Sequence, residues 1–427
     1  MTDLSAPIAL LQQMDWHVWL AMFWYMVLLE VPRYTFSFVV VAGSEITGIG
    51  RRKGGVAQAR QRVSVVIAGH NEAEAMRKCL RSLAEQTRRI DEIIAVDDGS
   101  TDGMREVLQE LRRDGLIHIA LCNQVRCGKA AACNLGMGIA SGDIIVNVDA
   151  DCSYDRDAIA KLLEPFADPR VGAACGNIGV RNAAASVVTS YQAVEYLVSI
   201  SLGKRVLDMF DLVVCASGAF AAFRREALQQ VGANVPGPGE DFDMTMRLRR
   251  AGWTIRFVGD SWCMTDVPDT LGALVRQRRR WDRDTIRIRL RKFRDVFTSS
   301  RGRFNAMETW EQVEFLFLNL IVTLIFPAYI GWLFFVFGAD AWILLVAVGL
   351  IYTVLDAIAF SLAAIVSRRY DLRAITALLP YVVTYGFFNG YVMRTVRLWA
   401  YFEEWVFRTS YRDAYVPQRV LDVADRY

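Results

Sequence analysis

The chain has 427 residues, 53% of them hydrophobic, and a formal net charge of only +3. That length accommodates two or three domains of about 150 residues each, and the small charge gives no reason to expect nucleic acid as a partner. Three histidines argue against a histidine-ligated metal or a Ser-His-Asp triad, and the eight scattered cysteines are expected to be reduced thiols. Apolar residues gather near the N-terminus and after residue 309, which predicts a membrane protein with an inserted soluble domain.

The first predicted element is a transmembrane helix. Residues 16–42 can span a bilayer at about 1.5 Å per residue, and no basic segment or cleavage site marks them as a signal peptide. Glu30, Pro32 and Arg33 interrupt the segment, and such residues favour protein or a water-filled path over lipid. The basic cluster at 51–62 then places the N-terminus outside and the next domain in the cytoplasm.

Strands and helices alternate from residue 63 onward. The expected strands cover residues 63–67, 92–96, 117–121, 144–148, 171–174, 212–215 and 255–258. The expected helices between the first four cover residues 72–86, 104–113 and 129–140. Because parallel strands need crossover helices, this pattern predicts a βαβ sheet with helices on both faces.

Two carboxylates follow the strand at 144–148. Asp149 and Asp151 are two residues apart, so in extended backbone their side chains project to one side. Ligands of open α/β sheets bind outside the carboxyl ends of the strands. A carboxylate pair there suits Mg²⁺ or Mn²⁺, which takes one or two protein oxygens and completes its shell with substrate phosphates. Read alone, two acids after a strand are more often a solvated turn.

Other polar segments are expected at the same edge of the sheet. Asp97 and Asp98 end the second strand, where an acid can accept from a nucleobase imide or a ribose hydroxyl. The alternative is an ordinary strand-to-helix turn with a helix cap. Residues 70–72 close the first strand, and residues 126–129 open a helix whose amides and lysine can meet a diphosphate. No Walker pattern is present, which excludes a phosphate-cradling ATPase loop.

Two later segments carry further candidates. The glycine- and proline-rich loop at 236–241 runs into a predicted helix, and Asp241 is expected either to cap that helix or to act as a general base. In the arginine-rich region 266–308, Arg280 can stabilise a leaving diphosphate, and the Trp281 indole can stack against a sugar ring. This region is predicted to hold amphipathic interfacial helices, with a solvated basic helix as the alternative.

The region 309–402 is predicted to be transmembrane. Its apolar blocks are 313–338, 341–366 and 375–400, with a basic cluster between the last two that fits a cytoplasmic turn. Counting crossings places the polar tail, 403–427, outside, whereas nearby arginines argue for the inside. A re-entrant last block would reconcile the two, and both topologies stay open.

A resemblance to a known family rests on four motifs that occur in order. They are Asp97-Asp98-Gly99-Ser100, Asp149-Ala150-Asp151, Gly239-Glu240-Asp241 and Gln277-X-X-Arg280-Trp281. Together they resemble the signature of the processive membrane β-glycosyltransferases of family 2, which include the hyaluronan, chitin and chitooligosaccharide, poly-N-acetylglucosamine, cellulose and curdlan synthases. The resemblance covers residues 63–296.

The resemblance implies a GT-A fold, an α/β Rossmann-like mixed sheet, at residues 51–265, in a cytosolic domain inserted into an α-helical transmembrane domain. It implies a UDP-sugar donor (UDP-GlcNAc or UDP-glucose), a glycan acceptor, and Mg²⁺ or Mn²⁺ on Asp149 and Asp151. The donor-binding residues it implies are Asn71, Glu72, Asp97, Asp98, Lys129, Asp149, Gln277 and Arg280. The implied catalytic residues are Asp241, as the base, and Glu240. The implied acceptor residues are Ser217, Gly218 and Trp281.

Two departures narrow the assignment. His70 stands where many members have tyrosine, and Cys152 stands where cellulose synthases carry histidine. One membrane helix before the domain, within residues 1–50, and three after it look most like the chitooligosaccharide synthases. The predicted function is inverting transfer to a growing glycan and its extrusion across a bacterial-type inner membrane, with export or accessory proteins as candidate partners. The alternatives are a non-processive transferase that loads a lipid carrier and an inactive export subunit.

Overall fold

The structure, a computed structural model, describes residues 15–17, 35–48, 61–235, 237–297, 304–367, 369–412 and 416–423. Most of the predicted first transmembrane helix, including Glu30, Pro32 and Arg33, lies outside the described residues, as does Pro236. The chain divides into two compact units. The larger unit contains residues 52–312 and 399–427, and the smaller one contains residues 1–51 and 313–398.

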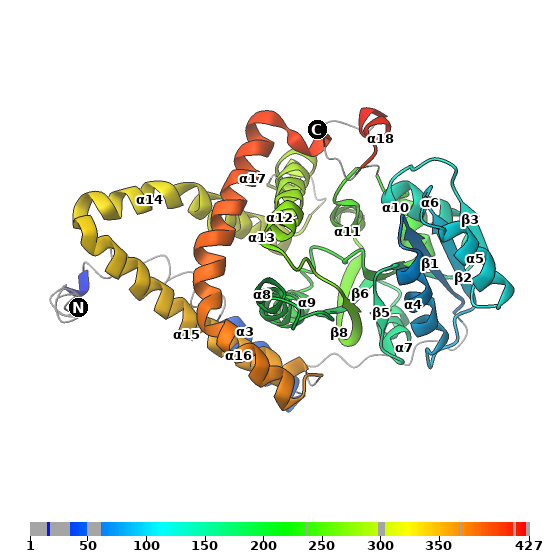
Figure 1. The fold of residues 1–427 in the computed structure, drawn as a ribbon, viewed down its shortest axis with the longest axis horizontal. Coiled ribbons are helices and arrows are strands. Elements are labelled where there is room, and N and C mark those ends of the chain that lie inside the picture. The colour runs from blue at the N-terminus through cyan, green and yellow to red at the C-terminus, as the bar shows by residue number, and fades with distance from the viewer. Residues whose placement is uncertain are drawn as a thin grey trace. The chain divides into compact units, whose positions relative to one another are not determined.

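The larger unit is built on an eight-stranded sheet with the order β3-β2-β1-β4-β7-β6-β8-β5. Figure 1 labels β1, β2 and β3 at one end of this order and β6, β8 and β5 at the other. Its strands are β1 (Val63–Gly69), β2 (Glu92–Asp97), β3 (Ile119–Cys122), β4 (Ile144–Asp149), β5 (Ser153–Tyr154), β6 (Val171–Val180), β7 (Phe220–Arg224) and β8 (Thr254–Thr265). The strands β3, β2, β1 and β4 are parallel, whereas β7 runs antiparallel to both β4 and β6. The sheet is therefore mixed, as predicted.

The parallel half forms because its strands are apolar runs that can be covered on both faces. Every residue of β1 is buried, which is typical of strands between two layers of helices. The crossover helices are α4 (Ala73–Ala84), α5 (Met104–Arg113) and α6 (Lys129–Ile139). In α4 the buried side chains recur at Met76, Cys79, Leu80 and Leu83, the spacing of a single helix face.

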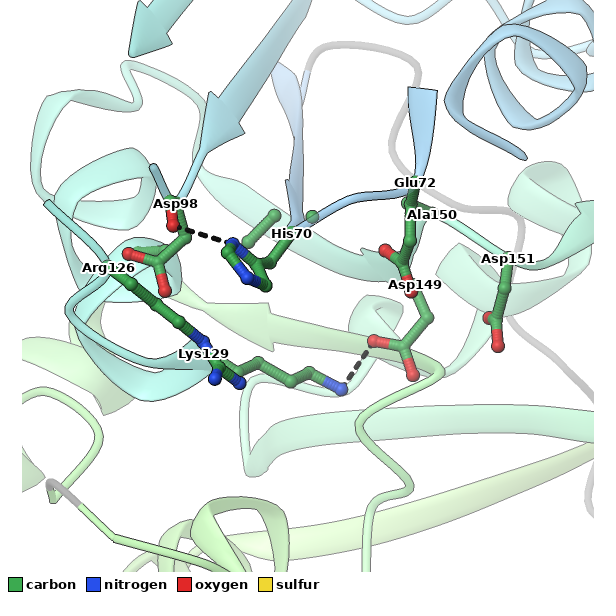
Figure 2. Close-up of a pocket in the computed structure, with 11 residues that line it drawn as sticks. His70, Glu72, Asp98, Arg126, Lys129, Asp149, Ala150 and Asp151 are labelled. Atoms are coloured by element: carbon green, nitrogen blue, oxygen red, sulfur yellow. Dashed lines mark hydrogen bonds and ion pairs between the residues drawn. The ribbon is translucent and has the colours of Figure 1, made fainter. Parts of the chain in front are cut away.

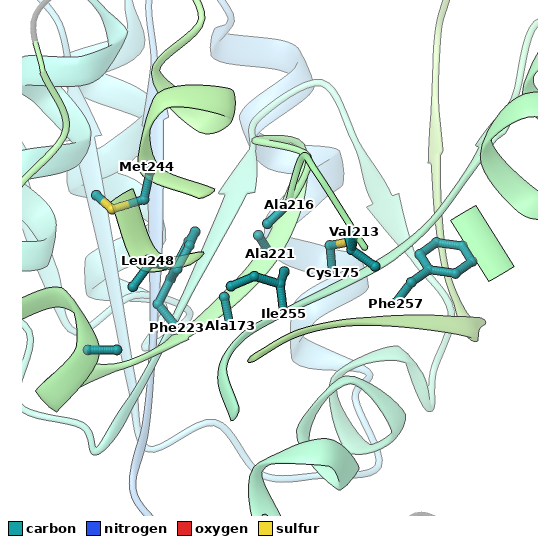
Figure 3. Packing of buried hydrophobic residues seen from close by; sticks show 11 residues of the cluster. Ala173, Cys175, Val213, Ala216, Ala221, Phe223, Met244, Leu248, Ile255 and Phe257 are labelled. Carbon is teal, nitrogen blue, oxygen red and sulfur yellow. The ribbon is translucent and has the colours of Figure 1, made fainter. Parts of the chain in front are cut away.

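The antiparallel half is covered by α10 (Arg225–Val231) and α11 (Glu240–Arg250). Met244 and Leu248, four residues apart in α11, pack into a buried cluster with residues of β6, β7 and β8 (Figure 3). This packing fixes the position of α11, whose first two residues are Glu240 and Asp241.

The remaining helices of the larger unit connect or flank these layers. They are α7 (Ala158–Leu163), α8 (Val187–Glu195), α9 (Lys204–Met209), α12 (Leu271–Ile286), α18 (Gln418–Val423) and most of α13 (Ala306–Glu314) and α17 (Arg394–Phe407). The α8–α9 region was not predicted from the sequence.

The predicted strand at 212–215 is wrong, because this segment has no regular structure and the strand lies later, at β7. Val213 is buried, so the apolar pattern correctly indicated a buried segment. Its backbone is instead satisfied by side chains and by a bond from the Leu212 amide to the Leu207 carbonyl. The Cys215 carbonyl accepts from Lys204 Nζ at 3.1 Å, and the Ala216 amide donates to Thr245 Oγ1 at 2.8 Å.

The smaller unit contains α3 (Ser37–Thr47), α14 (Val322–Phe337), α15 (Ala341–Ser367) and α16 (Leu372–Phe387). Among the described residues, one helical stretch, Ala306–Ser367, is long and apolar enough to cross a membrane, with a mean hydropathy of 2.4 over 18 of its residues. The predicted blocks 313–338 and 341–366 both fall within it. The third block and the multi-pass topology stay predictions.

Candidate active site

A pocket lies at the carboxyl ends of β1, β2 and β4 (Figure 2). It is lined by Ala68, Gly69, His70, Glu72, Asp98, Arg126, Lys129, Ala132, Asp149, Ala150 and Asp151. The strand register explains this gathering, because β1 places Gly69 opposite Asp97 and Ala68 opposite Asp149. Residues that follow the three strands therefore meet at one edge of the sheet.

The Asp98 carboxylate organises one wall of the pocket. Its oxygens accept from the amides of Cys127 and Gly128, both at 2.7 Å, and from Asn123 Nδ2 at 3.2 Å. Gly99 has φ +70°, and a Cβ at this position would lie 2.7 Å from the Arg126 amide nitrogen. Asp98 and Gly99 thus hold the loop of residues 126–128 against the end of β2.

The neighbouring predicted donor residues, Asp97 and Asn71, make local contacts instead of lining the pocket. Asp97 Oδ1 accepts from the Ser100 amide at 2.9 Å, which closes a turn after β2. Asn71 Oδ1 accepts from the Thr101 amide at 2.8 Å, with the Asn71 backbone at φ +57°. Their contact with a nucleotide stays a prediction.

The motif resemblance implies that this pocket binds UDP, so an Asp98→Asn variant is expected to weaken nucleotide binding. A neutral amide cannot accept from both loop amides, and a hydrogen bond to a charged group contributes roughly 1.5–3 kcal/mol. The UDP dissociation constant should therefore rise about tenfold or more, measured by titration calorimetry of the full chain in detergent. Asp97→Asn is the matched control and should change UDP affinity much less. Equal effects of the two substitutions would contradict the inference that Asp98 holds the loop of residues 126–128 in place for binding.

Lys129 connects three elements at the floor of the pocket. Its Nζ lies 2.5 Å from Asp149 Oδ1, at the end of β4, and 3.8 Å from Glu240 Oε1, at the start of α11. A Cβ on Gly218 would lie 3.5 Å from this Nζ and 3.5 Å from Asp241 Oδ2. Burial raises the pKa of Glu240, opposed by the Lys129 charge. The structure thus brings together predicted donor, acceptor and catalytic residues.

Asp241 is held in a fixed orientation without capping the helix. The cap of α11 is Gly239, at φ +73°, which makes no side-chain cap bond. Asp241 Oδ1 accepts from the Phe242 amide at 2.7 Å, and Oδ2 accepts from the Gly218 amide at 3.0 Å. A carboxylate oxygen has two lone-pair directions, so Asp241 can accept a further proton besides these two amides.

Three carboxylates gather at the other side of the pocket. Burial, together with the charges of Asp151 and Asp149, raises the pKa of Glu72 to about 7. Burial and the Asp149 charge likewise raise the pKa of Asp151. Among the described residues, no group of three or more His, Cys, Asp or Glu side chains can hold a metal ion unaided. As hard oxygen donors, Asp149 and Asp151 would fit Mg²⁺ or Mn²⁺ whose remaining ligands are oxygens of a diphosphate.

Gln277, Arg280 and Trp281 share one face of α12 and do not line the pocket. Asp284, one turn further on that face, packs on Gly239: a Cβ there would lie 3.0 Å from Asp284 Cβ. The motif face is therefore anchored beside the loop that precedes Asp241. Trp281 is 40% exposed, and Gln277 Oε1 is buried without a partner among the described residues, so both have capacity for a ligand.

The side of α12 that carries Arg279, and the helical turns after α12, are held by two adjacent glutamates of α17, in a segment that the sequence predicts to be a polar tail. Glu403 accepts from both Arg279 Nε and Nη2. Glu404 is fully buried and accepts from Arg291 Nη1 at 2.6 Å. The signal in the sequence was the pair of acids within the aromatic run Tyr401-Phe402-Glu-Glu-Trp405.

Two more contacts were missed by sequence reasoning. Ser217, predicted on the acceptor side, already accepts from Lys204 Nζ at 2.5 Å. The C-terminal segment reaches the pocket loop, where Arg419 donates to the Arg126 carbonyl and Pro417 lies beside Gly128. No local pattern pairs residues this far apart in the chain.

Known proteins with similar sequences are glycosyltransferases. The sequence profile described as Glycosyl transferase family 2 matches residues 64–232. A poly-beta-1,6-N-acetyl-D-glucosamine synthase from Staphylococcus epidermidis is 27% identical over 329 residues, 74% of this chain and 77% of the relative. The synthase of that name from Staphylococcus aureus (strain COL) is 31% identical over 242 residues, 56% of this chain and 58% of the relative.

Among solved structures, a mannosyltransferase from Pyrobaculum calidifontis in complex with GDP-Man and Mn²⁺ is similar in fold. The TM-score is 0.55 at 20% sequence identity, with 88% of this chain and 96% of that chain covered. This likeness shows that the GT-A-like mixed sheet is shared.

Proposed function

This chain is a glycosyltransferase with a family 2 domain, related to the poly-β-1,6-N-acetylglucosamine synthases, and from that premise we propose that it transfers N-acetylglucosamine from UDP-N-acetylglucosamine to a growing polysaccharide. The observation that carries the proposal is the contact of Lys129 with Asp149 and Glu240, beside Asp241. This contact links the part of the pocket where the donor diphosphate would lie to the position of the proposed base, Asp241. The names of the relatives support the sugar, and UDP-glucose is the alternative donor.

In the proposed reaction, Asp241 removes a proton from the acceptor hydroxyl as this oxygen attacks the anomeric carbon. The new bond forms on the face opposite the departing UDP, so the configuration at that carbon inverts. The loop held by Asp98 and the Lys129 ammonium bind the nucleotide diphosphate, and Arg280 stabilises the charge that develops on it. Bound Mg²⁺ or Mn²⁺, on Asp149 and Asp151, would supply further neutralisation of that charge.

We place the catalytic unit at the cytoplasmic face of a membrane, with the product passing outward. The apolar stretch Ala306–Ser367 supports a membrane location, and repeated transfer would keep the glycan beside it. Glu30 and Arg33 are candidates to line the export path, although they lie outside the described residues.

The test is UDP release by detergent-purified full chain offered UDP-GlcNAc, UDP-glucose and UDP-glucuronate, separately and in pairs, with product length read on a gel. We expect turnover with UDP-GlcNAc alone and a polymeric product. Turnover only with a pair of donors would replace the proposal with an alternating copolymer. A single sugar recovered in the lipid fraction would favour the lipid-carrier enzyme, and no turnover with any donor would favour an inactive export subunit.

A further inference from the structure

A second cavity in the larger unit is strongly basic and takes no part in the proposed reaction. It is lined by Leu290, Arg291, Lys292, Arg294 and Arg408. The first four come from the helical turns that continue α12, and Arg408 follows α17. Four of the five lining side chains carry a positive charge, so the cavity suits an anion.

Two of these cations build the wall and are already neutralised. Arg291 is paired with the buried Glu404, and Lys292 Nζ lies 2.5 Å from Asp243 Oδ1 in α11. These pairs tie the cavity to α17 and α11, and they give it a fixed shape.

Arg294 and Arg408 are different, because neither side chain has a hydrogen-bond or ion-pair partner among the residues that the structure describes. Both are exposed, and no carboxylate in the described part of the chain forms an ion pair with either. The planar guanidinium fork matches phosphate oxygens bidentately. The uncompensated charge therefore favours a phosphate group as the occupant.

The helix that leads to Arg408 indicates where that phosphate comes from. Large apolar side chains of α17 are exposed directly before it: Trp399, Phe402, Trp405, Val406 and Phe407. Trp405, for example, is 66% exposed. Aromatic residues next to basic ones are typical of the boundary between headgroups and acyl chains. A soluble phosphate would leave these side chains in water.

We propose that the basic cavity binds the phosphate of an anionic phospholipid headgroup through Arg294 and Arg408, with the exposed side chains of α17 in the adjoining bilayer boundary. The inference depends on the membrane location under the proposed function, but it does not depend on transferase activity. Lipid retention and turnover can therefore fail independently.

The test is native mass spectrometry of the full chain in detergent, incubated with phosphatidylglycerol or with phosphatidylcholine of the same acyl chains. Wild type should retain phosphatidylglycerol preferentially. Arg294→Gln combined with Arg408→Gln should lower that retention about thirtyfold, since each basic residue near an anionic surface contributes about fivefold in affinity. Phosphatidylcholine retention should not change.

The matched control removes two charges elsewhere, through Arg112→Gln combined with Arg113→Gln at the exposed end of α5. It should retain phosphatidylglycerol as wild type does, and unchanged UDP affinity in both variants would show that they are folded. Undiminished retention in the Arg294/Arg408 variant, or an equal loss in the control, would overturn the proposal. So would binding of water-soluble glycerophosphoglycerol or inorganic phosphate as tight as that of the lipid.

Discussion

An Asp241→Asn variant is expected to lose transfer by roughly 10²–10⁴-fold, the usual contribution of a general base, while still binding UDP. Asparagine has nearly the same shape, and its oxygen can still accept from either the Phe242 or the Gly218 amide. The amide cannot take up the acceptor proton. The measurements are the rate of UDP release at saturating donor and the UDP dissociation constant of the same preparation.

The matched control is Asp114→Asn, which removes an exposed carboxylate at the end of α5 and should leave the rate unchanged. Glu240→Gln is the informative comparison. If Glu240 acts through its 3.8 Å contact with Lys129, its loss should weaken donor binding as well as turnover. A fully active Asp241→Asn enzyme, with Glu240→Gln inactive, would transfer the role of base to Glu240.

The parallel half of the sheet could be predicted because its signals are local. The strand at 144–148 is an apolar run interrupted only by Asn147, with Asp149 and Asp151 after it, and the structure has β4 there, ending at Asp149. The helix predicted at 104–113 has the same bounds in α5. A buried parallel strand needs no knowledge of distant residues to be recognised.

The antiparallel half required information that is not local. The segment at 212–215 has the apolar residues of a strand, but the side chains of Lys204 and Arg249 satisfy its carbonyls from other elements. The true strand, β7, is rich in small residues, Phe-Ala-Ala-Phe-Arg, because it packs between β4 and β6. The composition of one segment does not reveal which strands lie beside it.

The candidate site likewise has features that the local sequence predicts and features that it does not. The four motifs identified the candidate residues, but their order in the chain says nothing about which of them meet. Lys129 and Glu240 are neighbours only because α6 and α11 begin at the same edge of the sheet. The role of Asp98 in holding residues 126–128 was also invisible, since it depends on backbone amides. Backbone contacts leave no residue pattern to read.

Removal of either carboxylate of the Asp149–Asp151 pair is expected to abolish metal-dependent turnover. We expect Asp149→Asn and Asp151→Asn each to weaken Mn²⁺ binding by roughly 100-fold, because a site with only two protein oxygens loses half of them. Treatment of wild type with EDTA should stop UDP release, and added Mg²⁺ or Mn²⁺ should restore it. Electron paramagnetic resonance of Mn²⁺, with and without UDP, measures binding apart from catalysis.

The expected effect of UDP on the affinity for Mn²⁺ is the more specific part of this prediction. No group of three ligating side chains is present among the described residues, so Mn²⁺ alone should bind weakly and UDP should strengthen its binding. Tight Mn²⁺ binding without nucleotide would contradict the proposed site.

The two aspartates can be separated, because only Asp149 is paired with Lys129. If Asp149 serves chiefly to hold that ammonium, Asp149→Asn will bind Mn²⁺ normally in the presence of UDP, whereas Asp151→Asn will not. Glu72→Gln is the control: it removes a neighbouring half-buried carboxyl whose pKa is raised to about 7 by burial and then by the charges of the pair, and Mn²⁺ binding should persist. Since the variants differ by single charges in one pocket, their order of Mn²⁺ affinity identifies which carboxylates carry the metal.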